Sequence, residues 1–123
     1  MATRWTLGCD AADPHRLAAF WAGALGYQPE PGYQDPDGAS IVDPDGVGPA
    51  IGFLRVPEGK TTKNRVHIDI RATAAPGDRE HLIRTTAARL AAEGATVVQE
   101  QTYDGRLGHI VMHDPEGNEF CVA

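Results

Sequence analysis

The sequence has no run of apolar residues near the roughly 20 that a membrane-spanning helix needs. It also lacks a basic cluster, because its 11 Lys and Arg residues are scattered among 17 Asp and Glu residues, for a net charge of −6. Such a chain is poorly suited to nucleic acid or anionic membranes as main partners. Its first residues lack the basic and then apolar pattern of a secretory signal. These absences predict a cytoplasmic protein with no nucleic-acid and no membrane partner.

Cysteine is scarce as well. The only two, Cys9 and Cys121, lie near opposite ends of the chain. In a reducing compartment thiols are the default state of such a pair, so no disulfide is expected. Apolar residues make up 41% and charged residues 23% of the 123 positions. These fractions are ordinary for a soluble globular protein, and the length suits one domain or two small halves that share a core.

Two segments have helical character. Asp13 followed by Pro14 is typical of a helix start, and apolar residues then recur at helical spacing as far as Leu25. Gly26 suits the left-handed residue that ends a helix. The pattern therefore predicts a helix over Asp13–Leu25 and a second one from Asp78 to Gly94.

The remaining patterned segments are short and have the character of strands. Turn signals rich in Asp, Pro and Gly separate them, as in Asp43-Pro-Asp-Gly and Asp114-Pro-Glu-Gly-Asn. Alternation and β-branched residues support strands in these segments. The predicted strands are Arg4–Cys9, Ala39–Val42, Pro49–Val56, Lys63–Arg71, Thr96–Thr102, Leu107–His113 and Glu119–Val122.

The order of these elements indicates an internal repeat. The helix-start residues Asp13 and Asp78 lie 65 positions apart, and the turns that begin at Asp43 and Asp114 lie 71 apart. Landmarks in the same order at nearly constant offset favour two copies of strand–helix–strand–strand–strand, although an unrepeated α+β chain could show similar coincidences.

The segment Lys63–Arg71 alternates strictly, which predicts a strand with one apolar and one polar face. His67 and Asp69 lie two residues apart and therefore on the same face. An imidazole with its pKa tuned by a carboxylate could serve as a general base, so both are candidate catalytic residues. The alternative is a face that is simply solvated. The apolar face consists of Val66, Ile68 and Ile70, and the polar face of Arg65, His67, Asp69 and Arg71.

Three motifs together resemble the vicinal oxygen chelate superfamily, the fold of glyoxalases, bleomycin-resistance proteins and extradiol dioxygenases. They are Asp13-Pro-His-Arg-Leu-Ala-Ala-Phe-Trp, Asn64-Arg-Val-His-Ile-Asp and Asp114-Pro-Glu-Gly-Asn-Glu-Phe-Cys. The closest resemblance is to the small glyoxalase-like branch. It implies a single α+β domain over residues 1–123, with βαβββ modules at about 1–58 and 64–123. The resemblance further implies that their mixed, curved sheets pair into a cup with the helices on the convex side, and that the chain forms a homodimer.

The resemblance also places four metal-ligand positions. Two fall on His67 and on Cys121, seven residues after Asp114. A third falls on Thr6, seven residues before Asp13, and the last lies in the strand around Ala50–Val56, which contains no His, Asp, Glu, Gln or Cys. A catalytic metal generally needs three protein ligands. The resemblance therefore implies a protein that binds a small organic molecule in a concave cavity, with no complete metal site and no other cofactor.

Other functions stay open. The main alternative is a lyase, isomerase or dioxygenase that uses Zn, Ni, Mn or Fe, held by His67 with Glu119 or Asp69. If a metal binds, the expected set is His67, Glu119 and Cys121. A metal-free enzyme with His67 as general base and an accessory interaction module without a ligand are further alternatives, so the sequence does not decide whether the protein is an enzyme.

Residues expected to line the ligand cavity come from both modules. Four of them have a structural alternative: core packing for Trp21, a solvated strand edge for Arg65, solvent exposure for His109 and small-residue filling for Cys121. The predicted ligand-binding residues are Thr6, Trp21, Tyr33, Leu54, Arg65, His67, His109, Glu119 and Cys121.

Overall fold

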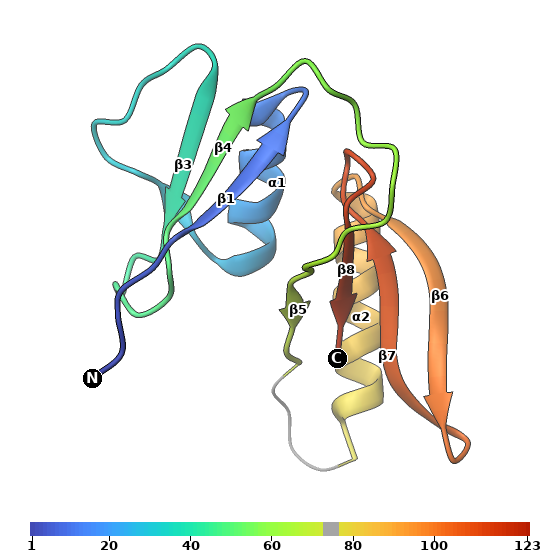
Figure 1. The fold of residues 1–123 in the computed structure, drawn as a ribbon. Helices are drawn as coiled ribbons and strands as arrows, with labels where there is room; N and C mark the ends of the chain where they lie inside the picture. The colour runs from blue at the N-terminus through green and yellow to red at the C-terminus, as the bar shows by residue number, and fades with distance from the viewer. Residues whose placement is uncertain (73–76) are drawn as a thin grey trace. The chain divides into compact units, whose positions relative to one another are not determined.

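The computed structural model describes residues 1–72 and 77–123, which form two compact units, Met1–Gly59 and Lys60–Ala123. Each unit contains one helix and one four-stranded mixed sheet. In each unit the helix lies against one face of the sheet (Figure 1). This confirms the predicted α+β class with two repeated modules. The cup that the two modules are predicted to form and the single domain over residues 1–123 stay predictions. In the part of the chain that the structure describes, no helix is long and apolar enough to cross a membrane.

In the first unit the sheet order is β1-β4-β3-β2, with β1 and β4 parallel and the other neighbours antiparallel. Helix α1 packs against β3 and β4. The structure adds a short edge strand, β2, that the sequence pattern did not predict. The elements are β1 (Leu7–Ala11), α1 (Pro14–Leu25), β2 (Gln28–Pro29), β3 (Gly38–Val42) and β4 (Ile51–Arg55).

The second unit repeats this topology. Its sheet order is β5-β8-β7-β6, again with the first two strands parallel and the others antiparallel, and α2 packs mainly against β7 (Figure 1). The identical order in both units confirms the internal repeat. The elements are β5 (Asp69–Ile70), α2 (Arg79–Ala92), β6 (Thr96–Tyr103), β7 (Arg106–His113) and β8 (Glu119–Val122).

The boundaries of α1 follow the local signals in the sequence. Asp13 caps the helix by accepting a hydrogen bond from the Arg16 N–H at 3.2 Å, and Pro14 begins it. Gly26 ends it with φ of 70°, a left-handed conformation that glycine adopts without steric cost. The corresponding prediction for Asp78 is only half right. Asp78 precedes α2, but its side chain makes no capping hydrogen bond.

The core of each unit lies between its helix and one face of its sheet. Alternating strand residues such as Phe53 in β4 and Met112 in β7 are buried there. Within residues 1–72 and 77–123, the other face of each sheet carries no helix of its own unit, and the intervening strand residues project from it. The buried side chains between α2 and its sheet include Ile83, Ala87, Leu90, Ile110, Met112, Phe120 and Val122.

The predicted strand over Lys63–Arg71 is wrong over most of its length. Only Asp69–Ile70 forms a strand, residues 65 and 66 form a bend, and Val66 is 75% exposed rather than in the core. The physical reason is a long-range contact. The backbone N–H of Asn64 donates to the Glu119 carboxylate at 2.9 Å, which holds the chain away from strand geometry at this point.

Candidate functional site

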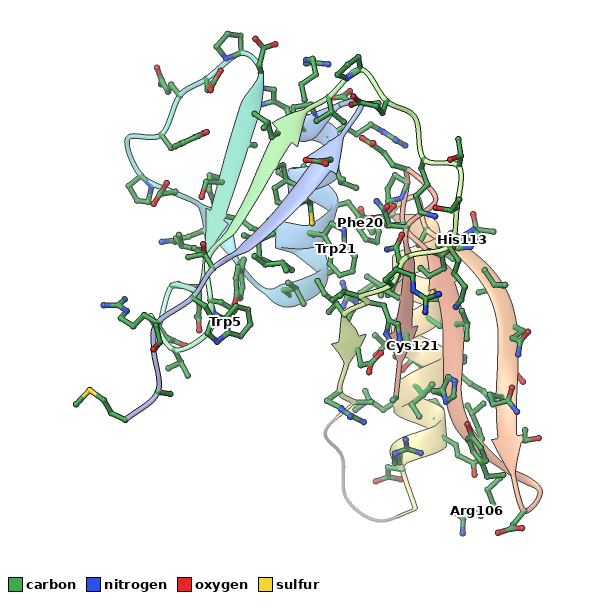
Figure 2. The ribbon with its side chains drawn as sticks, viewed as in Figure 1. Trp5, Phe20, Trp21, Arg106, His113 and Cys121 are labelled. Atoms are coloured by element: carbon green, nitrogen blue, oxygen red, sulfur yellow. The ribbon has the colours of Figure 1, made fainter. Side chains whose placement is uncertain are left out.

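The helix-free face of the second sheet carries most of the polar residues singled out in the sequence. In β8, Phe120 and Val122 are buried toward α2, so Glu119 and Cys121 project to the opposite face. The parallel register sets Asp69 of β5 directly beside Cys121. Cys121 and His113 lie on neighbouring strands of this sheet (Figure 2). We call this surface the polar face of the second sheet, defined by His67, Asp69, His109, Val111, His113, Glu119 and Cys121.

Three side chains of this face come together at its β5 edge. One donor atom from each of His67, Asp69 and Cys121 lies within 4.8 Å of the other two. The tightest contact joins His67 Nδ1 to Asp69 Oδ1 at 2.8 Å, and these two side chains are 43% and 39% exposed. We call these residues the donor cluster. It is accessible to small solutes from water.

Asp69 also acts on the thiol. Partial burial raises the pKa of Cys121 above its usual value, and the charge of Asp69 and a hydrogen bond from the thiol to Asp69 raise that pKa further. The positive charge of Lys63 partly opposes this shift. The carboxylate of Asp69 is therefore shared between an imidazole and a thiol, and it favours the protonated thiol while no cation competes for it.

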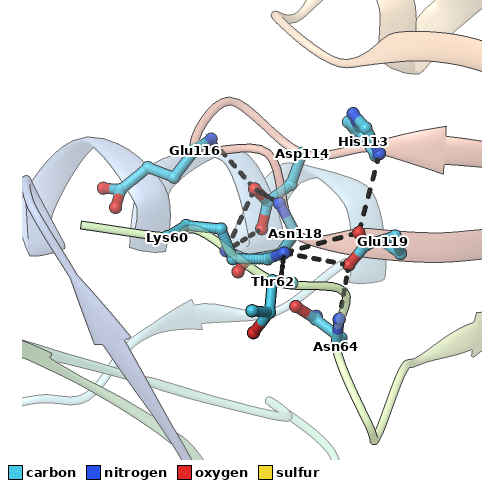
Figure 3. Close-up of polar contacts among 8 residues, drawn as sticks. All are labelled: Lys60, Thr62, Asn64, His113, Asp114, Glu116, Asn118 and Glu119. Carbon is cyan, nitrogen blue, oxygen red and sulfur yellow. Dashed lines mark hydrogen bonds and ion pairs between the residues drawn. The ribbon is translucent and has the colours of Figure 1, made fainter. Parts of the chain in front are cut away.

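Glu119 lies on the same face but is engaged elsewhere (Figure 3). Its carboxylate accepts the backbone N–H of Asn64 at 2.9 Å and lies 3.3 Å from the ammonium of Lys60. His113 Nε2 approaches it at 3.8 Å. The Asn64 hydrogen bond is the largest cause that lowers the pKa of Glu119 to about 2, and Lys60 contributes in the same direction. Glu119 thus ties the connector at residues 60–64 to β8.

We expect this tie to make the protein sensitive to acid. Because the pKa of Glu119 is about 2 in the folded state and 4.5 otherwise, its contribution is present above about pH 4.5 and is lost as the pH falls toward 2. Glu119→Gln should lower the free energy of unfolding by about 1–2 kcal/mol at neutral pH. Urea unfolding should show a smaller difference from wild type near pH 3.

The matched control for this experiment is Glu58→Gln, because Glu58 is exposed. It should leave the pH dependence of stability unchanged. A Glu119→Gln deficit of the same size at neutral and acidic pH would contradict the assigned role of the Glu119 charge.

The donors that lie together differ from the set expected for a metal. Glu119 does not belong to the group of mutually close donor atoms, whereas Asp69 does. The set of imidazole, carboxylate and thiol, one of each, provides the three protein ligands that a catalytic metal commonly has. By the chemistry of its donors, the cluster fits a divalent cation without help from the first unit.

Two other predicted residues of the second unit lie outside this cluster. His109 is on the polar face in β7, and its ring centroid lies 6.0 Å from that of Tyr103. Arg65 is exposed in the bend that precedes His67. Neither offers a donor atom to the donor cluster.

The predicted residues of the first unit are dispersed. Trp21 is 4% exposed and packs edge-on against Phe20 at 5.4 Å, in the core. Thr6 is exposed and precedes β1, and Leu54 is 55% exposed on the helix-free face of β4. Asp10 pairs with Leu54 and shares its face. The sequence analysis did not name Asp10 as a candidate site residue. Period-two alternation from Thr6 through Gly8 to Asp10 could have placed its side chain on this face.

Tyr33 lines a separate pocket of about 180 Å³ in the first unit. The pocket lies between α1 and the β2–β3 region. The Tyr33 hydroxyl lies close over Gly38, where an added Cβ would be 2.9 Å from its oxygen. Tyr33 therefore lines this pocket together with residues of α1 and β3. The lining residues include His15, Ala18, Ala22, Glu30, Tyr33 and Ser40.

Comparison with known proteins agrees with this fold. The fold is similar to that of a glyoxalase/bleomycin resistance protein/dioxygenase family enzyme from Burkholderia phytofirmans, at 16% identity and a TM-score of 0.74, over 95% of this chain and 94% of that one. A possible glyoxalase from Bacillus cereus is similar at 18% identity and a TM-score of 0.71, over 99% and 98%.

A mutant of the fosfomycin resistance protein FosX from Listeria monocytogenes, in complex with Mn(II) and 1S,2S-dihydroxypropylphosphonic acid, is also similar. It shares 13% identity at a TM-score of 0.72, over 99% of this chain and 89% of that one. A search of curated proteins found no match. The sequence itself matches the family model of the glyoxalase-like domain over residues 6–123, nearly its whole length. The chain therefore belongs to the glyoxalase-like domain family.

Proposed function

We propose that this protein binds a small organic molecule on the polar face of the second sheet. The observation that carries the proposal is the grouping of His67, Asp69 and Cys121 at one edge of a face that, in the part of the chain the structure describes, no helix of its own unit covers. Binding sites combine apolar surface with a few convergent polar groups. Val111 provides apolar surface beside Cys121 in the sheet, and the donor cluster provides the polar groups.

The family supports this function in general terms. The FosX mutant that shares the fold was solved with a small phosphonic acid bound. For the present chain, binding itself needs no metal, because an imidazole, a carboxylate and a thiol can each hydrogen-bond to a polar ligand directly. The homodimer and the cytoplasmic location expected from the sequence stay predictions.

A library of small polar fragments, followed by backbone amide NMR, tests the proposal. Fragments that bind should shift the amide signals of residues 67–70, 109–113 and 119–122. His67→Ala should weaken their binding by at least about tenfold, because a hydrogen bond to a partly buried polar ligand is lost. The control is His81→Ala, since His81 is exposed on α2.

Two results would count against a binding function of this face. One is a set of fragments whose shifts map only to the Tyr33 pocket of the first unit. The other is unchanged affinity in His67→Ala for fragments that do shift the polar face.

A second candidate function is metal-dependent catalysis by a lyase, isomerase or dioxygenase. It is favoured by the donor cluster, in which Asp69 takes the place expected for Glu119. A bound divalent cation would supply Lewis acidity toward a substrate oxygen. The metal-free alternative uses His67 as a general base, oriented by its contact with Asp69 at 2.8 Å.

A further inference from the structure

We propose that His67, Asp69 and Cys121 form a binding site for one borderline-soft divalent cation of the zinc type, with all protein ligands supplied by the second unit. This inference deepens the second candidate function and does not depend on the binding of an organic molecule. It replaces the expected set of His67, Glu119 and Cys121, and it requires no ligand from the first unit.

The backbone places the three donors without rearrangement of the sheet. Asp69 and Cys121 are register partners in the parallel β5–β8 pair. The Cys121 N–H also donates to the Ile68 carbonyl at 3.0 Å, which fixes the chain directly after His67 against β8. Because His67 and Asp69 are two residues apart, both side chains reach the side of the sheet from which Cys121 projects.

The distances suit a metal of this size. Zinc bonds of about 2.0–2.3 Å in a tetrahedral arrangement separate the donor atoms by about 3.3–3.8 Å. The donor atoms of the cluster lie within 4.8 Å of one another, and the closest pair is 2.8 Å apart. Adjustments of about 1 Å, within reach of side-chain rotation, would therefore give coordination distances.

The donor types select among cations. A thiolate and an imidazole favour zinc and similar borderline-soft ions over magnesium, calcium and manganese, which prefer oxygen ligands. Three protein ligands leave a fourth position of the tetrahedron for water or another small ligand. The side chains of His67 and Asp69 are 43% and 39% exposed, so an ion can enter from solvent.

Glu119 is a supporting residue in this arrangement. Its carboxylate is already held by the Asn64 N–H and by Lys60, at 2.9 Å and 3.3 Å. Asn64 lies three residues before His67, so this contact restrains the segment that carries the imidazole. Glu119 therefore stabilises one side of the cluster through the backbone, without offering it a donor atom.

Cobalt(II) is the probe that tests the site, because it accepts the same ligands as zinc and reports on them by absorption. The 123-residue chain, freed of metal and kept reduced with a phosphine, should bind one cobalt per chain. A sulfur-to-cobalt charge-transfer band should appear in the near ultraviolet, together with the intense visible bands of tetrahedral cobalt. Zinc should abolish both by displacing the cobalt.

The variants assign the ligands. Cys121→Ser should remove the charge-transfer band, while the matched Cys9→Ser should retain it. Asp69→Asn and His67→Ala should each weaken cobalt binding by at least about tenfold, while His81→Ala should not change it. Circular dichroism of every variant checks that the fold is retained.

The proposal is overturned if no sulfur-to-cobalt band forms, or if the band survives Cys121→Ser. Unchanged cobalt affinity in Asp69→Asn would also overturn the ligand set. These outcomes leave the fragment-binding experiment intact, because fragments are tested without added metal.

Discussion

Phe120→Ala is expected to lower the free energy of unfolding by about 3–5 kcal/mol, the range found when a large buried aromatic is truncated. Phe120 is 1% exposed and lies beside Met112 of β7, which is fully buried. Removal of the ring would leave a cavity under α2 that the surrounding side chains could fill only in part. Denaturant unfolding followed by circular dichroism measures the loss.

The neighbouring residue provides the control. Cys121 belongs to the same strand but projects to the opposite, helix-free face. Cys121→Ala should therefore cost about 1 kcal/mol or less. Equal losses in the two variants would mean that the strand is not two-sided, and the position of the donor cluster would then have to be reconsidered.

The second large effect is expected at the turn before β8. Asp114 is 4% exposed, and its carboxylate accepts the backbone N–H groups of Glu116 at 2.9 Å and Asn118 at 3.0 Å. The Asn118 side-chain amide donates to it as well, at 2.9 Å (Figure 3). Asp114→Ala would leave these donors without their acceptor, so we expect a loss of about 2–4 kcal/mol in unfolding free energy.

The first unit contains a similar turn, in which the side chain of a less buried aspartate accepts several backbone N–H groups. Asp43 accepts the N–H groups of Asp45, Val47 and Gly48 at 2.8–3.1 Å, and these bonds, chiefly the one from Gly48, lower the pKa of Asp43. Asp43→Ala should therefore destabilise the protein less than Asp114→Ala does. A larger loss of unfolding free energy in Asp43→Ala than in Asp114→Ala, measured by the same denaturant unfolding, would contradict the view that burial of the carboxylate sets the size of the effect.

Local signals in the sequence were enough to predict most of the fold. Asp13, Pro14 and Gly26 act within one helix, and the structure confirms the helix that they delimit. The β8 boundaries, Glu119–Val122, are also as predicted, because a tight turn precedes an alternating pattern. The edge strand β2 was missed because two residues, one of them Pro29, carry no periodic signal.

Contacts between distant residues explain the errors. The bend at residues 65–66 follows from the Asn64–Glu119 hydrogen bond, whose partners lie 55 positions apart. The same contact withdraws Glu119 from the donor cluster. Asp69 takes its place because the β5–β8 register sets it beside Cys121, and the sequence alone does not reveal that register. His67 and Cys121 were identified as metal-ligand positions through the family resemblance, and their proximity is a finding of the structure.

The two-sided character of β8 also has a practical consequence for protein engineering. Phe120 and Val122 maintain the packing beneath α2, whereas residue 121 and its neighbour at position 111 contribute mainly to the opposite surface. A combinatorial library at positions 109, 111 and 121 can therefore explore new ligand preferences with little loss of folded protein. Position 119 should be left unchanged in such a library, since its carboxylate anchors the connector.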